Sequence, residues 1–256
     1  MAFSYQGNQL LKKSGSQIEF TEEQIDEWIK CALDPIYFIE NYLKIVDADG
    51  EERPLILYSY QKEIVLSIHN NRFTITACAR RSGKSTATNA YIIWYILFNK
   101  NKLVVLLANK GDTAREQLGR IQFSYEKLPH WLQQGIGKWN EGSIELENGS
   151  RILATTTTSD SIRGYGPQLV FIDEAAHIDN WDDFQAATLP TITRGKKTKL
   201  ILVSTPYGLN HFYDIWQNSD YNPKVVGTSA WNGYHAIKVT WKDAGYGEEW
   251  RQSTLA

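Results

Sequence analysis

The stretch FTITACARRSGKSTATNA, residues 73–90, decides the fold. Its first six residues are all apolar or β-branched, as in a buried strand, and a largely apolar helical segment follows the Gly-Lys-Ser triplet at 83–85. A strand that passes through such a triplet into a helix has the pattern of a phosphate-binding loop, G-x-x-x-x-G-K-[ST]. Cys78 stands in place of the first glycine of that pattern, and Arg80 and Arg81 lie inside the loop.

The remaining loop residues suit a phosphorylated ligand. Gly83 lets the backbone turn closely around phosphate, Lys84 can reach the β- and γ-phosphates, and Ser85 can offer its hydroxyl to Mg²⁺. The helix that follows aims its first amides and its positive dipole end at the anion. The alternative is that Lys84 is a solvated lysine that opens a helix. On the first interpretation the loop binds ATP through Arg81, Ser82, Gly83, Lys84, Ser85 and Thr86.

Downstream of this stretch, strands and helices alternate. The segment 103–108 (LVVLLA) is continuously apolar, as expected for a strand covered on both faces, and residues 112–132 are expected to be helical. Residues 143–147 and 151–155 alternate around Asn-Gly at 148–149, which predicts a hairpin. Buried strands are expected at 169–172 and 200–203, so the order favours a mostly parallel sheet flanked by helices.

Two carboxylates end one of these strands, in the sequence LVFIDE at 169–174. A carboxylate pair at the carboxyl end of a strand lies where open α/β sheets bind ligands. We expect Asp173 to hold Mg²⁺ and Glu174 to activate the attacking water as a general base. The prediction is therefore that Lys84 and these two acids converge on one magnesium-bound triphosphate.

Upstream, Thr21-Glu22-Glu23-Gln24 is a capping box. The helix it begins is expected to present an apolar face, and residues 1–20 lack periodicity and are expected to form a loose arm. A short strand at 55–57 and a helix at 60–70 precede the loop. The apolar positions of the first helix are Ile25, Trp28, Ile29, Ala32 and Leu33.

Composition limits the function classes. The chain has 256 residues, two cysteines and a formal net charge of −2, so nucleic acid is either not a partner or is gripped locally. The cysteines give no disulfide framework or metal cluster, and the longest apolar runs are too short to span a bilayer, so no membrane partner is expected. The basic run at 194–199 (RGKKTK) is either a solvated turn or a DNA contact.

Together these motifs resemble the large terminase subunit of tailed bacteriophages, which packages viral DNA into preformed capsids. The resemblance rests on the loop with its internal arginine, on LVFIDEAAHI at 169–178, on LILVSTPYG at 200–208, and on GLNHFYDIW at 208–216. It covers about residues 55–217. It implies a P-loop NTPase core of the RecA/ASCE-like type, with a small helical or lid subdomain built from the two chain ends.

The resemblance also implies roles for further residues. Arg80 would act within its own subunit on the γ-phosphate, Gln61 would read adenine, and Ser204 and Thr205 would sense the phosphate as the coupling motif. Arg163 would complete the site of a neighbouring subunit. Each role has an alternative. Arg80 could instead pair with a carboxylate, and Gln61 could be an exposed helix residue. Ser204 and Thr205 could form an ordinary strand cap, and Arg163 could be a solvated arginine.

The resemblance implies an organisation into residues 1–54, an arm and helices packing on the core; 55–217, the ATPase core; and 218–256, a small subdomain or linker. A nuclease is expected only in a further C-terminal domain. The implied activity is Mg²⁺-dependent ATP hydrolysis that drives double-stranded DNA into a procapsid. Portal protein and the small terminase subunit would be partners, in a ring of subunits on the capsid, with a monomer in isolation possible.

The expected location is the host cytoplasm and, transiently, the procapsid. A helicase-like DExx ATPase and a non-catalytic nucleotide-dependent assembly switch are the alternatives. Gln117 to Arg120 precedes the acidic strand, the wrong order for a helicase arginine motif, and Glu174 argues against a pure switch.

Overall fold

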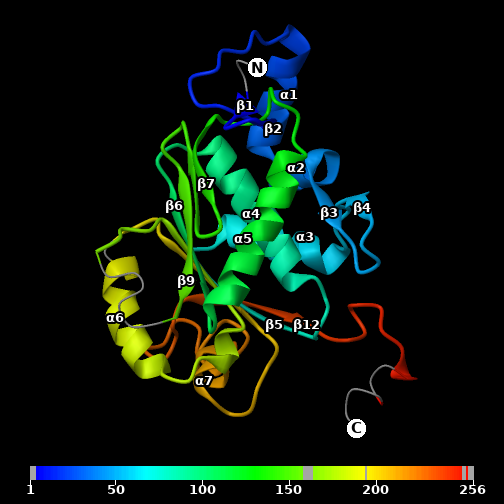
Figure 1. The fold of residues 1–256 in the computed structure, drawn as a ribbon. Helices are drawn as coiled ribbons and strands as arrows, with labels where there is room; N and C mark the ends of the chain where they lie inside the picture. The colour runs from blue at the N-terminus through cyan, green and yellow to red at the C-terminus, as the bar shows by residue number, and fades with distance from the viewer. Residues whose placement is uncertain (1–3, 158–163, 194, 250–251, 253–256) are drawn as a thin grey trace.

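The computed structural model describes residues 4–157, 164–193, 195–249 and 252. Helices and strands alternate along most of the chain (Figure 1). The helices are α1 (Glu22–Leu33), α2 (Pro35–Tyr42), α3 (Ser59–Asn70), α4 (Lys84–Phe98), α5 (Gly111–Glu126), α6 (Trp181–Thr193) and α7 (His211–Gln217), with a short 3₁₀ turn, η1 (Ala175–His177). The strands are β1 (Ser4–Tyr5), β2 (Asn8–Lys12), β3 (Lys44–Val46), β4 (Glu52–Pro54), β5 (Phe73–Cys78), β6 (Leu103–Ala108), β7 (Ile136–Asn140), β8 (Ser143–Leu146), β9 (Arg151–Thr156), β10 (Leu169–Asp173), β11 (Lys199–Ser204) and β12 (Tyr234–Val239).

The central sheet has eight strands within the described part of the chain, in the order β12-β5-β11-β10-β6-β9-β8-β7. The first six in this order run parallel, and β8 and β7 continue the sheet antiparallel. The predicted mostly parallel sheet and the predicted hairpin, which is the pair β8 and β9, are confirmed. In the parallel part, β11 separates β5 from β10, so the loop strand and the acidic strand flank a third strand.

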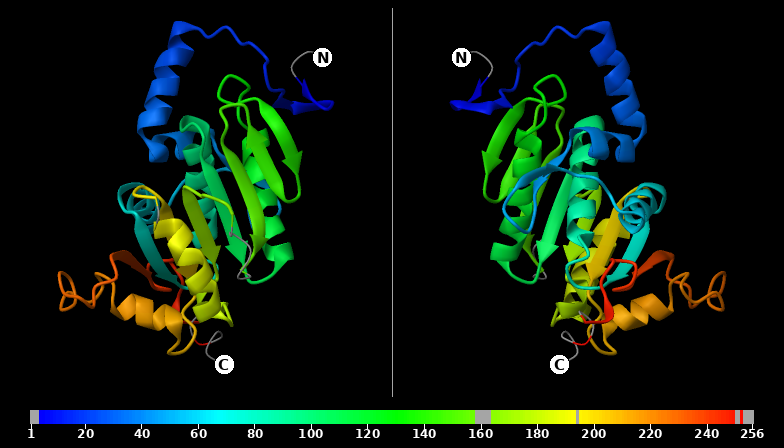
Figure 2. Two further views of the ribbon diagram at one scale, coloured as in Figure 1. Left: turned by 90° about the vertical axis from the view of Figure 1, so that its left-hand side faces the viewer. Right: turned by 90° about the vertical axis from the view of Figure 1, so that its right-hand side faces the viewer.

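Helices cover both faces of the sheet. Val104 and Leu106 of β6 face the layer that contains α3, α4 and α5, whereas Val105 and Leu107 face the layer of α6 and α7. Figure 2 shows these two layers on opposite sides of the strands. Because successive side chains of a strand point to opposite faces, strands between two apolar layers must be apolar throughout, as β6 is.

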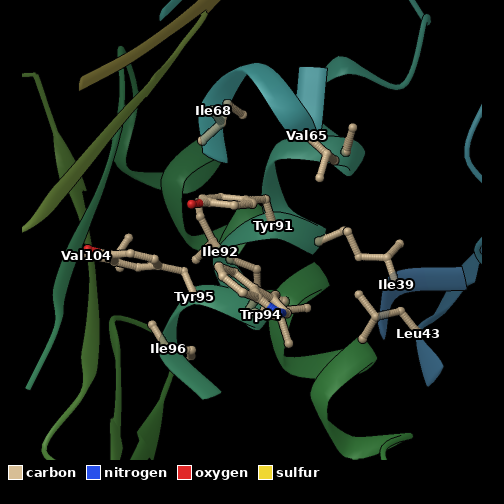
Figure 3. Packing of buried hydrophobic residues seen from close by; sticks show 14 of the residues in the cluster. Ile39, Leu43, Val65, Ile68, Tyr91, Ile92, Trp94, Tyr95, Ile96 and Val104 are labelled. Atoms are coloured by element: carbon tan, nitrogen blue, oxygen red, sulfur yellow. The ribbon is translucent and has the colours of Figure 1, made fainter. Parts of the chain in front are cut away.

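Helix α4 is the central element of the first layer. From residue 90 to residue 97 every side chain is buried, as expected for a helix that is surrounded by other elements. Figure 3 shows Tyr95 near Val104 of β6, and Trp94 on the side of Ile39 and Leu43. The Trp94 indole Nε1 donates a hydrogen bond to the Cys31 carbonyl oxygen at 2.8 Å, which links α4 to α1. The helix is therefore fixed on several sides at once.

The N-terminal part corrects two expectations. Residues 4–12, predicted as part of a loose arm, form a hairpin of β1 and β2 in which Leu11 is fully buried. The capping box of α1 is confirmed, since Thr21 Oγ1 accepts from the Gln24 amide at 3.2 Å and Gln24 Oε1 accepts from the Thr21 amide.

The predicted apolar face of α1 only partly matches the buried face. Trp28 packs against Phe98 and Cys31 is fully buried. By contrast, Ile25, Ile29 and Leu33 stay exposed, with 76% of Leu33 accessible. The reason is that α1 lies at one end of the molecule, with the body on one side only (Figure 1).

Three further boundaries differ from the sequence prediction. Residues 55–57 form no strand: the Leu55 amide donates to the Leu43 carbonyl oxygen and the Leu57 amide to Glu40 Oε1. Helix α5 ends at Glu126 rather than near 132, since Pro129 cannot continue a helix. The predicted core ended at residue 217. Strand β12, at 234–239, nevertheless pairs with β5 in the central sheet. In the described residues, no helix combines the length and apolarity needed to cross a bilayer.

Candidate active site at the carboxyl edge of the sheet

Side chains of α3 hydrogen-bond to the backbone of the loop between β5 and α4. The Tyr60 hydroxyl donates to the Ser82 carbonyl oxygen at 2.9 Å, and Gln61 Nε2 donates to the same oxygen at 3.3 Å. Gly83 has φ +69°, and a Cβ atom at this position would lie 2.4 Å from Gln61 Nε2. The positive φ therefore favours glycine, and any larger residue would also have to displace the Gln61 amide. Arg81 also adopts a left-handed conformation, with φ +59°.

Gln61, predicted to read adenine, uses both ends of its amide inside the protein. Its Oε1 accepts from the Tyr58 amide at 3.0 Å, and its Nε2 also approaches the Gly83 carbonyl oxygen at 3.4 Å. The side chain is buried against the loop. In this conformation Gln61 shapes the loop, a contact that sequence spacing did not indicate.

The structure brings the loop lysine and the strand-end acids together. Lys84 Nζ lies 2.9 Å from Glu174 Oε1, and the Ser85 hydroxyl donates to Asp173 Oδ2 at 2.8 Å. The parallel register explains this, because Asp173 pairs with Val203 of β11 and the next residue, Ser204, pairs with Ala77 of β5. The strand ends therefore meet at one edge of the sheet.

Asp173 is almost completely buried, with 6% of its surface accessible. Its Oδ2 accepts from Ser85 and from Gln117 Nε2, and its Oδ1 accepts from the Glu174 amide at 3.0 Å. Burial raises the pKa of Asp173 above its ordinary value, although the bond from Ser85 opposes this. Ser85 and Asp173 thus place two hard oxygen donors side by side, a donor set that suits Mg²⁺.

Gln117 was not among the predicted site residues. It lies on the inward face of α5, where the other positions at helical spacing, Ala114, Leu118 and Ile121, are apolar and buried. A polar side chain at an otherwise apolar position is the signal that could have identified it.

Glu174 follows β10 in a left-handed conformation, with φ +51°. Strained backbone of this kind in a non-glycine residue is common at functional sites. Burial acts to raise the pKa of Glu174, but the ammonium of Lys84 and the Thr205 amide hold the pKa below its ordinary value. The carboxylate is therefore charged and partly accessible at neutral pH, as a proton acceptor must be.

Ser204 and Thr205 connect the end of β11 to both partners of this ion pair. The Thr205 hydroxyl lies 3.4 Å from Lys84 Nζ, and the Thr205 amide donates to Glu174 Oε2 at 3.4 Å. The Ser204 hydroxyl accepts from the Ala176 amide at 3.1 Å and donates to the Thr205 carbonyl oxygen at 2.9 Å. A displacement of Lys84 or Glu174 would thus be felt directly by this segment.

A cleft of about 480 Å³ opens onto these groups. Arg80 and Arg81 are both exposed and line this cleft. Thr86, the residue after Ser85, is half-buried in the first turn of α4. His177 lies 3.8 Å from Glu174 Oε2. Arg163 lies outside the described residues. The cleft thus gathers several cations around the buried Asp173 and the partly exposed Glu174, which suits a polyanion with a metal ion. Its lining is Arg80, Arg81, Lys84, Ala108, Asn109, Lys110, Thr113, Asp173, Glu174 and His177.

Comparison with known proteins agrees with this geometry. Residues 75–256 match the family described as terminase large subunit, T4likevirus-type, N-terminal. The terminase large subunit of Escherichia phage T5 is 30% identical over 149 residues, which are 57% of this chain and 33% of that protein. The chain thus spans about a third of the length of this curated relative.

Solved structures share the fold. The large terminase ATPase domain of Thermus phage P74-26 superimposes with a TM-score of 0.61 at 19% identity, over 74% of this chain and 85% of that one. The large terminase of bacteriophage HK97 gives 0.62 at 18%, over 82% and 43%. A large terminase from a thermophilic bacteriophage, in complex with ADP, gives 0.56 at 13%, over 78% and 49%. The predicted P-loop fold of the RecA/ASCE-like type is confirmed.

Proposed function

The chain belongs to the family of terminase large subunits, T4-like virus type, N-terminal region, and from this premise we propose that it hydrolyses ATP with Mg²⁺ to drive viral double-stranded DNA into a procapsid. One observation carries the proposal. Lys84 Nζ lies 2.9 Å from Glu174 Oε1, while Ser85 contacts the adjacent Asp173 at 2.8 Å. A phosphate-binding lysine, a metal-holding pair and a proton acceptor therefore share one edge of the sheet.

In the proposed reaction, Lys84 and the amides at the start of α4 bind the phosphates. Ser85 and Asp173 would hold Mg²⁺, which when bound neutralises charge on the phosphate oxygens. Arg80 and Arg81, exposed on the cleft, add positive charge where the γ-phosphate would lie. In this account Arg80 stabilises the charge that develops during cleavage, and Arg163 does so for a neighbouring subunit.

Glu174 is the proposed general base, and its ion pair with Lys84 controls its basicity. While Lys84 is paired with Glu174 Oε1, the pKa of Glu174 stays below its ordinary value. When Lys84 turns to a phosphate, Glu174 loses its strongest charged partner, its pKa rises, and it can take a proton from water. The base is thereby activated only when the nucleotide is in place.

The contacts of Thr205 with both Lys84 and Glu174 support a coupling role for the end of β11. We propose that Ser204 and Thr205 pass loss of the γ-phosphate to α7 and the rest of the motor. Gln61 is proposed to contact adenine after releasing part of its hold on the loop.

The proposal extends to assembly. Double-stranded DNA, portal protein and the small terminase subunit are the expected partners, and a ring of subunits on the procapsid is the expected working form, in the host cytoplasm. Nuclease activity is assigned to a separate C-terminal domain. Purified protein of this sequence should accordingly neither cut nor unwind DNA on its own.

ATP turnover in the presence of Mg²⁺ tests the enzymatic part. The protein should release phosphate, Lys84→Ala should lose both nucleotide binding and turnover, and Glu174→Gln should lose turnover while still binding ATP. Lys100→Ala, at an exposed position outside the cleft, is the matched control and should behave like the unchanged protein. Undiminished turnover by Lys84→Ala protein would reject the site assignment.

A further inference from the structure

Gln117 contacts the most buried group of the site from an element that belongs neither to the loop nor to the acidic strand. It lies on α5, is 5% exposed, and donates through Nε2 to Asp173 Oδ2. Because a carboxylate only accepts hydrogen bonds, the NH₂ end of the amide must face Asp173, which fixes the orientation of the side chain. The carbonyl oxygen Oε1 of Gln117 therefore points away from the Asp173 carboxylate.

This carbonyl oxygen, Oε1, is buried and finds no hydrogen-bond partner among the described residues. A buried carbonyl oxygen without a donor is unfavourable, and such atoms call for an unseen partner. The proposed metal ion beside Asp173 would bring ordered waters, since Mg²⁺ keeps several of its waters when it binds to proteins. A water of that kind could donate to Oε1.

We propose that Gln117 is a positioning residue for Mg²⁺, a role that rests on the proposed function: its NH₂ group fixes the Asp173 carboxylate, and its carbonyl oxygen accepts a hydrogen bond from a metal-bound water. Together with Ser85 and the Glu174 amide, Gln117 gives the Asp173 carboxylate three donors. This leaves the carboxylate one orientation. Partners of this type typically change metal affinity about 10- to 100-fold when they are removed.

The position of Gln117 also links α5 to the metal. Asn109 and Lys110, just before α5, line the cleft, and Gln117 lies further along the same helix. A change at Gln117 would therefore act on the orientation of Asp173 directly, since Gln117 bonds to Asp173. Metal affinity and nucleotide affinity are consequently expected to respond differently to changes in this helix.

The test is metal binding by Gln117→Met, which keeps the volume of the side chain but removes both amide atoms. Gln122→Met is the matched control, the same substitution on the same helix at a position whose Nε2 bonds to the Asn140 carbonyl oxygen. Mn²⁺ is titrated into each protein with ADP present and followed by electron paramagnetic resonance. ADP affinity is measured separately in EDTA, and ATP turnover against Mg²⁺ concentration.

Gln117→Met should weaken Mn²⁺ binding and raise the half-saturating Mg²⁺ concentration about 10- to 100-fold, with ADP affinity in EDTA within about twofold of the unchanged protein. Gln117→Asn, which keeps an amide but shortens its reach, should weaken metal binding in the same way. Gln122→Met should leave all three quantities unchanged.

Two results would overturn the inference. Unchanged metal binding by Gln117→Met would show that Asp173 needs no help from α5. An equal loss of ADP affinity in EDTA would show a general structural role instead. If the unchanged protein neither bound Mn²⁺ with ADP nor turned over ATP, the proposed function itself would be wrong, and the inference with it; that outcome is distinct because it does not depend on Gln117.

Discussion

The two ends of α4 differ in their side chains and in their surroundings. Its first turn carries Lys84 and Ser85 toward the acids of β10 and follows a left-handed glycine, whereas residues 90–97 are buried on every side. The first end carries polar groups and follows a loop with positive φ at Arg81 and Gly83, and the second end is closely packed. The packed end fixes the helix axis against α1, α2 and β6, so the polar end is placed without adjusting itself.

This comparison separates two kinds of cost. Variants at the polar end should change chemistry and leave stability nearly intact, because the groups there meet ligand rather than core. Variants at the packed end should change stability and leave the chemistry of the folded molecules intact. Variants at the junction should change both.

The largest effect is expected at the polar end, from Arg80→Ala. If Arg80 neutralises charge on the γ-phosphate, turnover should fall about 10³-fold or more, which is about 4 kcal/mol of transition-state stabilisation. The melting temperature should stay within a degree or two, because Arg80 is exposed. Steady-state phosphate release and thermal melting measure the two quantities. Arg81→Ala is the control for a nonspecific loss of positive charge, and an equal loss in both variants would remove the special role of Arg80.

Trp94→Ala tests the packed end. Removing this buried indole and its bond to the Cys31 carbonyl oxygen should lower the free energy of unfolding by about 3–5 kcal/mol. Urea denaturation measures the loss, and ATP affinity is measured at a temperature where the variant remains folded. Affinity within about threefold of the unchanged protein is the expected result. A large loss of affinity in fully folded protein would mean that the two ends of α4 are not separable.

Gly83→Ala tests the junction between the ends. The added Cβ meets Gln61 Nε2 at 2.4 Å, and a left-handed alanine adds strain, so stability should fall by roughly 1–3 kcal/mol together with nucleotide affinity. Adding Gln61→Ser removes the clash but not the backbone strain. The double variant should therefore recover part of the stability. No recovery would show that the contact with Gln61 does not set the loop.

The smallest effect is expected from Thr21→Ala, which removes the cap of α1. This helix contacts α4 at Trp94 and Phe98, far from the first turn, so the change should cost about 1 kcal/mol of stability and leave turnover unaltered. Urea denaturation detects such a change, and Thr21→Ser, which keeps the hydroxyl, is the control. Reduced turnover would mean that α1 influences the site directly.

The sequence predicted the inner parallel strands at 73–78, 103–108, 169–172 and 200–203 to within one residue at each end. The strands at 73–78 and 103–108 begin and end as expected, and a helix follows the Gly-Lys-Ser triplet, because continuous apolar runs bounded by polar turns leave few alternatives. The acids at 173 and 174 were placed by the same logic, since carboxyl ends of parallel strands share an edge.

The features that the sequence did not predict depend on contacts between residues that are distant in the sequence. Strand β12 follows a long stretch with few apolar residues, and only its pairing with β5 makes it part of the core. The exposed side of α1 depends on which face the body covers. Gln117 carries no motif of its own, and Gln61, to which the resemblance assigns adenine, bonds to the loop. In each case a contact distant in sequence decides the outcome.

The central claim is that Lys84, Asp173 and Glu174 serve one magnesium-bound triphosphate. A crystal structure with Mg²⁺ and a non-hydrolysable ATP analogue tests it most directly. Lys84 Nζ should leave Glu174 Oε1, now 2.9 Å away, and contact the β- and γ-phosphates, with the metal ion beside Ser85 and Asp173 and a water within hydrogen-bonding distance of Glu174. A nucleotide bound elsewhere, with the pair of Lys84 and Glu174 intact, would contradict the account.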